Sequence, residues 1–191
     1  IVLCRHLFSL LVMNHYDYLK TLETLWKKGV ERYQSGIRGA SEIFDQTDQA
    51  FLSANGVTRQ EIYDFCEDFV SGGEPDFATF VAVTDVRRHY FFEMLHATPA
   101  EQTVDPASYP PKDAEIDGIV WLPRIIEKAK AKLRGQLDDD TMYGCGGDRR
   151  FFREHDFHPA QFLRVVETYE NDDAAIINWV KSHSAAINQL A

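Results

Sequence analysis

Cys145 is the residue whose type and surroundings are best suited to chemistry in this chain. It stands in the glycine-rich turn 143–148, and we predict that a helix begins near Asp148. The positive end of a helix favours a thiolate, and Arg149 and Arg150 place further positive charge nearby. Cys145 and Asp148 are therefore the candidate catalytic residues. The alternative is that Cys145 is a small, half-buried residue of a tight turn.

Asp148 has a counterpart in Asp48, which lies 100 residues earlier. Each aspartate precedes an apolar pair by three residues, Phe51-Leu52 in one case and Phe151-Phe152 in the other. We interpret both as helix-capping residues, whose carboxylates accept backbone N–H groups at a helix start. Under this interpretation Asp148 stabilises the turn and takes no part in catalysis.

Two segments contain the residue types of metal sites. His155 and His158 are flanked by acidic side chains, and Glu93 and His96 have the Glu-x-x-His spacing of di-iron bundles. A di-iron site needs a second such pair, which the sequence lacks, and His158 followed by Pro159 is also typical of a plain helix start. We therefore expect neither a metal nor a cofactor. A metal-binding helical protein stays an open alternative.

The helix that must position Cys145 precedes the turn. Its apolar residues recur at the i, i+3, i+4, i+7 spacing of one helical face, and they are Leu122, Ile125, Ile126, Ala129 and Leu133. Lysine and arginine side chains occupy the other faces towards the C-terminal end, where the helix dipole favours cations. Gly135 is expected to end this helix.

Further helices are predicted from apolar spacing and from their start and stop residues. Thr58 and Glu61 form a capping box, in which each side chain satisfies a free backbone N–H of the other residue. The predicted helices of the first half span about 16–34, 41–54, 58–70 and 75–95. No hairpin with alternating strands is indicated. The pattern predicts an all-α fold.

The apolar pattern of the first half returns 100 residues later. Residues 97–117 contain four prolines and no apolar period, which is typical of a linker. We predict about eight helices in two similar halves, since four segments keep one offset. The expected organisation is an N-terminal extension (1–15), a first helical repeat (16–96), the linker (97–117) and a second helical repeat (118–191). Met13 is the candidate start of the native chain.

The second half resembles the bacterial domain-of-unknown-function family 5069. The resemblance covers about residues 110–185, with a weaker internal copy at about 16–85. The residues that carry it are Gly118, Trp121-Leu122-Pro123-Arg124, Tyr143-Gly144-Cys145-Gly146-Gly147-Asp148 and Phe151-Phe152. The family usually has Pro-Leu after the cysteine, where this chain has Gly146-Gly147. The resemblance implies no activity.

Composition narrows the class of protein. Apolar residues make up 45% of the 191 residues, enough for a packed core, and the net charge is −10. A negative chain without a basic patch is a poor partner for nucleic acid or for an anionic membrane. The three cysteines, Cys4, Cys66 and Cys145, are far apart in the sequence, which fits a reducing cytoplasm. We predict an acidic cytoplasmic protein.

Three functional hypotheses follow. The first is a non-catalytic helical module that binds a protein or a small molecule in a groove between the halves, because no set of catalytic residues converges. The second is a thiol-dependent enzyme or redox sensor that uses Cys145. The third is a metal-binding protein. Cys66 is expected in the core, because it shares a helical face with Ile62, Phe65 and Phe69.

Overall fold

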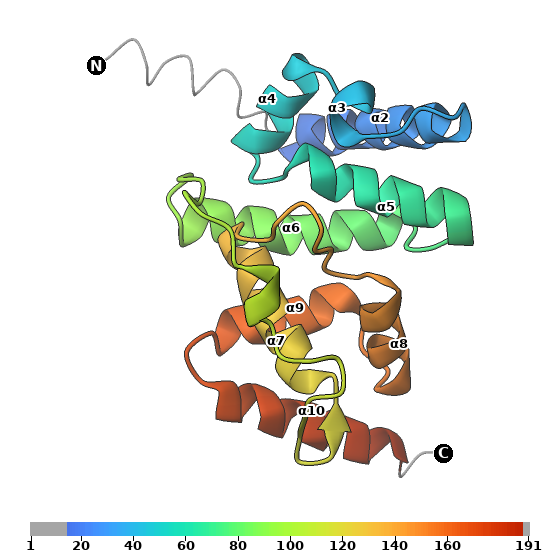
Figure 1. Ribbon diagram of the computed structural model, residues 1–191. Coiled ribbons are helices and arrows are strands. Elements are labelled where there is room, and N and C mark those ends of the chain that lie inside the picture. The colour runs from blue at the N-terminus through green and yellow to red at the C-terminus, as the bar shows by residue number, and fades with distance from the viewer. Residues whose placement is uncertain (1–14, 189–191) are drawn as a thin grey trace. The chain divides into compact units, whose positions relative to one another are not determined.

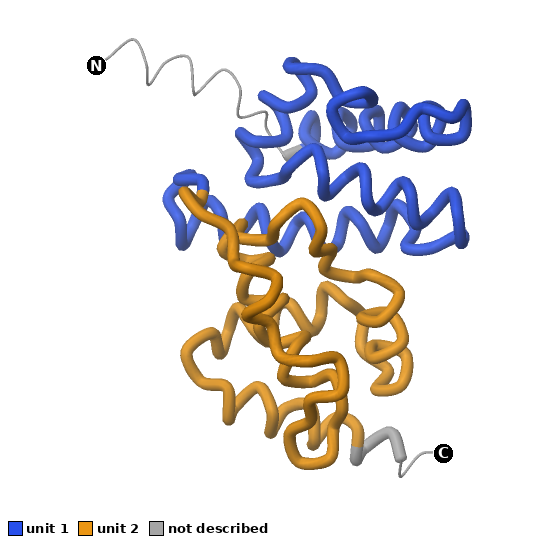
Figure 2. Tube along the Cα trace, viewed as in Figure 1, with its two compact units in different colours: residues 1–99 blue, residues 100–191 orange. Residues whose placement is uncertain are grey.

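The computed structural model describes residues 15–188 of the chain (Figure 1). These residues form nine α-helices, one short 3-10 helix and one two-stranded sheet, so the prediction of an all-α fold is confirmed. The chain divides into two compact units, unit 1 (residues 1–99) and unit 2 (residues 100–191), which Figure 2 distinguishes by colour. Between residues 15 and 188 no helix is both long and apolar enough to cross a bilayer. Met13 lies outside the described residues.

Unit 1 is built around the pairing of its first helix with its fourth. Its helices are α2 (His15–Gln34), α3 (Ala40–Ile43), α4 (Gln46–Ala54), α5 (Arg59–Gly72) and α6 (Phe77–Glu93). Helices α2 and α5 pack together, and α6 also contacts α2. The indole ring of Trp26 links these three helices, because its centroid lies 5.3–5.6 Å from the rings of Phe69, Phe77 and Phe80. Such contacts combine a large buried apolar area with favourable ring geometry.

Local signals explain where the helices of unit 1 begin and end. The predicted capping box of Thr58 and Glu61 is present at the start of α5. The single helix predicted for 41–54 is wrong: Phe44 is extended, and the chain starts a new helix after Asp45. The reason is that the Asp45 carboxylate accepts the N–H groups of Thr47 and Asp48, so it caps α4.

Unit 2 contains four longer helices and a small hairpin. Its elements are η1 (Pro106–Ser108), β1 (Glu115–Ile116), β2 (Ile119–Val120), α7 (Leu122–Arg134), α8 (Gly146–Glu154), α9 (Pro159–Thr168) and α10 (Asp173–Asn188). Strands β1 and β2 are antiparallel, which the sequence analysis missed. The signal was Asp117-Gly118, whose φ angles of 54° and 80° suit a tight hairpin turn. Gly135 ends α7 in the left-handed conformation, as predicted.

Aromatic side chains fill the core of unit 2. Helices α7 and α9 pack together, and α8 contributes adjacent phenylalanines to the same core. The ring centroids of Phe151, Phe152 and Phe157 each lie 5.8–6.2 Å from that of Phe162 in α9. This core fixes the start of α8, and therefore the turn that carries Cys145.

Cys66 lies in the core of unit 1, as predicted, and it is fully buried. Its Sγ faces Gly29 on α2. A Cβ added at Gly29 would lie 2.5 Å from this sulfur and 3.0 Å from Cζ of Phe44. The two helices approach so closely here that only a residue without a side chain fits.

We predict that Gly29→Ala destabilises the protein by about 1–3 kcal/mol through overpacking. Alanine is otherwise preferred over glycine in a helix by about 1 kcal/mol, so the sign of the change is diagnostic. Urea unfolding measures it. Gly29→Ala combined with Cys66→Ala should recover much of the loss, because the second change removes the clashing sulfur.

Gly72→Ala is the matched control, since a Cβ at this helical glycine would meet nothing within 4 Å. That variant should unfold at the wild-type urea concentration or slightly above it. Equal effects of the two alanine substitutions would contradict the close approach of α2 and α5 at Gly29.

Candidate functional site

Asp148 is the centre of the candidate site, and it is fully buried. It is the third residue of α8, and the residue that precedes this helix is Cys145. The helix thus begins two residues earlier than predicted. The Asp148 carboxylate accepts the backbone N–H of Gly144 at 2.9 Å. This N–H belongs to the turn before α8, so Asp148 has a backbone partner but is not the N-cap residue that was predicted.

Two side chains complete the hydrogen bonds of this carboxylate. Oδ2 of Asp148 lies 2.5 Å from Nζ of Lys128 in α7, and Oδ1 accepts the indole N–H of Trp121 at 2.9 Å. The Lys128 side chain is only 3% exposed. A charged pair removed from water is stable only when its remaining hydrogen-bonding capacity is met. The three donors to Asp148 meet this requirement.

Gly147 makes room for the indole ring that reaches Asp148. A Cβ at Gly147 would lie 2.6 Å from two carbon atoms of the Trp121 ring. Trp121 itself precedes α7 in the left-handed conformation, with φ of 74°, which is uncommon for a bulky residue. Gly147 therefore has a packing role at this turn.

Cys145 lies at the edge of this buried network. Its Sγ is 3.4 Å from Nζ of Lys128, and the residue is partly exposed. It occupies the N-cap position of α8, yet its side chain accepts no backbone N–H there. Cationic groups and helix N-termini are environments in which thiols react as nucleophiles. The arrangement offers a thiol beside a fixed ammonium group.

Tyr143 closes the site on its buried side. Its hydroxyl donates a hydrogen bond of 2.8 Å to the carbonyl of Pro159. Burial raises the pKa of Tyr143 well above its ordinary value, and the Asp148 carboxylate adds to the effect. The phenol is thus held as a neutral donor and is not available as a base.

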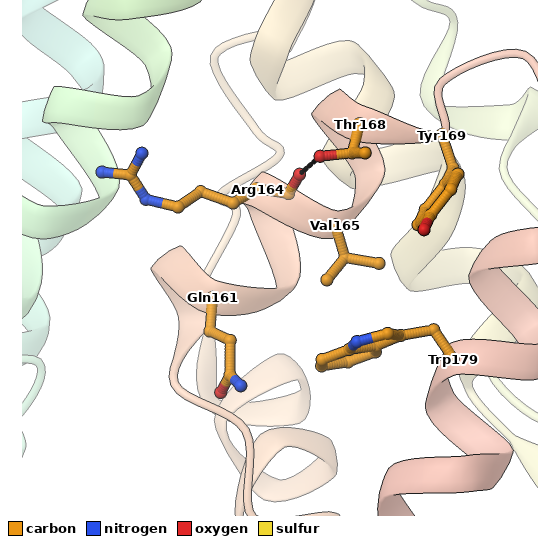
Figure 3. A pocket seen from close by; sticks show the side chains of 6 residues that line it. All are labelled: Gln161, Arg164, Val165, Thr168, Tyr169 and Trp179. Carbon is orange, nitrogen blue, oxygen red and sulfur yellow. Dashed lines mark hydrogen bonds between the residues drawn. The ribbon is translucent and has the colours of Figure 1, made fainter.

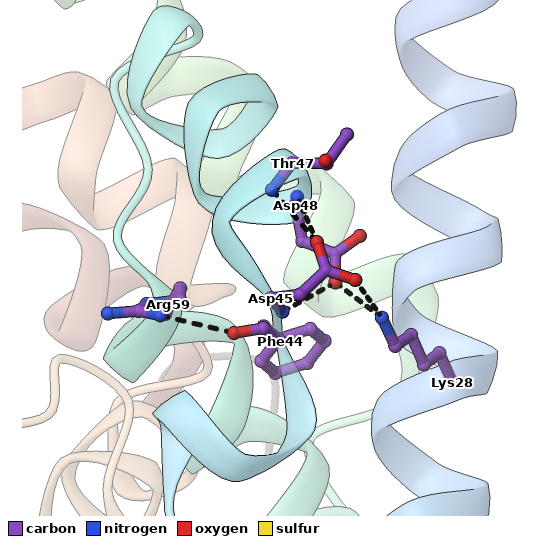
Figure 4. Close-up of polar contacts among 6 residues, drawn as sticks. All are labelled: Lys28, Phe44, Asp45, Thr47, Asp48 and Arg59. Atoms are coloured by element: carbon purple, nitrogen blue, oxygen red, sulfur yellow. Dashed lines mark hydrogen bonds and ion pairs between the residues drawn. The ribbon is translucent and has the colours of Figure 1, made fainter.

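Unit 1 contains a similar pair at positions 100 residues earlier. Lys28 of α2 contacts Oδ2 of Asp48 at 2.5 Å and Oδ2 of Asp45 at 3.2 Å (Figure 4). This pair is less buried, because the Lys28 and Asp48 side chains are 29% and 13% exposed. Asp45 occupies the position in unit 1 that Cys145 occupies in unit 2, so a carboxylate stands there in place of a thiol.

Sequence reasoning found Cys145 and Asp148 but missed Lys128 and Trp121 as parts of the site. The structure brings all four together. A usable signal existed for the lysine: Lys28 and Asp48 recur as Lys128 and Asp148 with the same separation. A repeated pair of opposite charges predicts a contact. Trp121 stood out in the sequence only as one of the residues that carry the family resemblance, and its position did not indicate a contact with Asp148.

The structure gives the predicted metal-site residues other roles. Nδ1 of His155 lies 3.0 Å from Oγ of Ser184, and burial lowers its pKa. His158 caps α9 by accepting the N–H of Ala160. Helix α6 ends at Glu93, so the Glu93 and His96 pair is not helical as predicted. Among residues 15–188, no group of three histidine, cysteine or acidic side chains is arranged to hold a metal.

A groove on unit 2 is a separate candidate site. It lies between α9 and α10 and has a volume of about 440 Å³. Figure 3 shows the side chains around it, which are Gln161, Arg164, Val165, Thr168, Tyr169 and Trp179. Tyr169 is 40% exposed. Exposed aromatic side chains beside polar groups are typical of binding surfaces.

We predict that Lys128→Met destabilises the protein by about 3–5 kcal/mol, because it leaves Asp148 charged and unpaired in the core. The matched control is Lys28→Met, which should cost about 1 kcal/mol or less, since its partly exposed aspartates can be solvated. Thermal unfolding monitored by circular dichroism compares the two. Similar losses at both positions would contradict a dominant role for burial.

Comparison with known proteins reaches unit 2 alone. No curated protein and no solved structure matches the chain. Residues 110–190 match the model of a family described as a domain of unknown function (DUF5069). These residues include α7, the turn with Cys145, α8 and α9, so the candidate site lies wholly within the matched region. The resemblance of this region to the family is therefore established.

Proposed function

We propose that the protein is a non-catalytic binding module whose ligand occupies the groove between α9 and α10. The observation that carries this proposal is that Tyr169 and Trp179 both line a hollow that includes Val165 (Figure 3). Trp179 is the most exposed of the three tryptophans, because Trp26 and Trp121 are core residues with 5% and 8% exposure.

The ligand that this groove fits best is an extended, proline-rich peptide. Proline rings stack on exposed tyrosine and tryptophan side chains, and an extended polyproline backbone offers unpaired carbonyl oxygens. Donors for those carbonyls are at hand. Gln161 uses its side-chain carbonyl oxygen to accept the His158 N–H, which leaves its NH₂ group as a donor.

We predict that a labelled polyproline peptide binds the full chain and that Tyr169→Ala weakens binding roughly tenfold or more, the effect expected of an aromatic anchor. Fluorescence anisotropy of the peptide measures the affinity. Tyr16→Ala is the control, since Tyr16 is an exposed aromatic residue of unit 1. The absence of binding, or an equal loss from both variants, would rule out this groove as the site.

A second candidate function is thiol chemistry at Cys145, as a thiol-dependent enzyme or a redox sensor. The contact of 3.4 Å between its sulfur and the Lys128 ammonium group favours this candidate. Partial exposure gives a reagent access to the sulfur. Cys66 provides an internal contrast. Burial alone raises the pKa of its thiol to about 12, so this thiol stays protonated at neutral pH.

We predict that iodoacetamide alkylates Cys145 of the folded protein at neutral pH several-fold faster than it alkylates the same residue in urea-unfolded protein. Cys66 should show the opposite order, because folding buries it. Peptide mapping by mass spectrometry separates the two sites. A folded-state rate at Cys145 below the unfolded rate would exclude an activated thiol.

We further infer that the two units are copies of one helical module. Helices α4 and α8 begin at residues 46 and 146, and α5 and α9 begin at 59 and 159. The Lys28–Asp48 and Lys128–Asp148 pairs keep the same offset. Superposition of the units at this offset tests the idea, and helix axes that diverge would refute it.

The free thiols of Cys66 and Cys145 support a cytoplasmic location.

A further inference from the structure

We propose that Cys145 is an oxidation site for hydroperoxides, and that its sulfinate product caps α8 as the Asp45 carboxylate caps α4. The proposal deepens the thiol function inferred above and rests on it. It is independent of the groove between α9 and α10. Its basis is a comparison of the same position in the two units.

In unit 1, the Asp45 carboxylate accepts hydrogen bonds from three donors. Its Oδ1 accepts the backbone N–H groups of Thr47 at 2.8 Å and Asp48 at 3.1 Å, and its Oδ2 lies 3.2 Å from Nζ of Lys28 (Figure 4). The backbone N–H of Asp48 and the Lys28 ammonium group hold the pKa of Asp45 below its usual value. The position therefore favours an anion with two oxygen atoms.

Unit 2 presents the same setting to Cys145. The backbone angles of the N-cap residue are φ −61° and ψ 170° for Cys145, against φ −76° and ψ −174° for Asp45. Both helices that follow have nine residues. The lysine is also in place, with Nζ of Lys128 3.4 Å from the sulfur. Two features differ. The Cys145 side chain accepts no N–H of the helix start, and Asp148 accepts the N–H of Gly144, whereas Asp48 accepts the N–H of the N-cap residue Asp45 itself.

The oxidised side chain has the shape and charge that this position lacks. A sulfinate carries two oxygen atoms on the atom bonded to Cβ, as an aspartate does, and it is an anion at neutral pH. Its oxygens can accept the N–H groups of Gly147 and Asp148 and a hydrogen bond from Lys128. Each of these bonds is charge-assisted, which makes it stronger than a bond to a thiol.

The chemistry needs only a hydroperoxide as oxidant. The Cys145 thiolate attacks the outer oxygen of the peroxide and the O–O bond breaks, so that Cys145 becomes a sulfenic acid. The oxygen that leaves takes a proton from solvent and departs as an alcohol or as water. A second hydroperoxide oxidises the sulfenic acid to the sulfinic acid and is reduced in the same way. The sulfinic acid then loses its proton to solvent. Each step transfers one oxygen atom and two electrons.

The experiment compares oxidation with a genetic mimic of its product. The full chain is treated with hydrogen peroxide, the oxygen atoms are located by peptide mapping, and Tm is measured. We expect two added oxygen atoms at Cys145, none at Cys66, and a Tm raised by roughly 4 °C or more. Cys145→Asp should show a similar rise without peroxide. Cys145→Asn should rise less, because it can cap α8 but cannot pair with Lys128.

Peroxide-treated Cys145→Ser is the control for oxidation of other residues, and its Tm should not rise. A Tm of Cys145→Asp at or below the wild-type value would overturn the sulfinate cap, even if alkylation shows Cys145 to be reactive. Failure of peroxide to oxidise Cys145 in preference to Cys66 would overturn the oxidation site. If alkylation of Cys145 were also slow, the proposed thiol function would be refuted as well.

Discussion

The buried ion pair between Lys128 and Asp148 is the interaction on which the second unit depends. Burying two charges costs several kcal/mol for each ion unless every donor and acceptor is matched. Asp148 finds its donors in three separate places: α7, the residue before α7, and the turn before α8. One carboxylate therefore fixes where α7 begins, where α8 begins and how the two helices meet.

This geometry explains why the turn between α7 and α8 has its unusual composition. Gly147 must lack a side chain because the Trp121 ring lies against it. Trp121 in turn needs the left-handed backbone so that its indole N–H reaches Asp148. Gly147 is thus required by the packing of the indole ring that donates a hydrogen bond to Asp148. Cys145 receives its position next to Lys128 as a consequence.

Much of the fold could be predicted from the sequence, because the helices follow apolar periodicity and have recognisable ends, such as Thr58 with Glu61 and Gly135. The break at Phe44 was missed because Asp45 caps α4 inside an otherwise helical pattern. Of the four residues of the candidate site, the sequence indicated two. Cys145 and Asp148 have suggestive types, whereas the role of Trp121 depends on a tertiary contact across 27 residues, which no local pattern encodes.

The two units differ chemically at the N-cap position, which is Asp45 in unit 1 and Cys145 in unit 2. The residue at this position can differ without breaking the lysine–aspartate ion pair. Lys28 and Lys128 both meet an aspartate that is the third residue of a later helix, α4 in unit 1 and α8 in unit 2. The N-cap residue lies beside the same lysine, but on its more exposed side, and there unit 1 has a carboxylate and unit 2 a thiol. A carboxylate at this position is permanently charged at neutral pH, so it can only stabilise. A thiol can gain oxygen and charge. The difference between a structural cap and a chemically responsive one therefore lies in a single side chain, held in place by an ion pair that both units share.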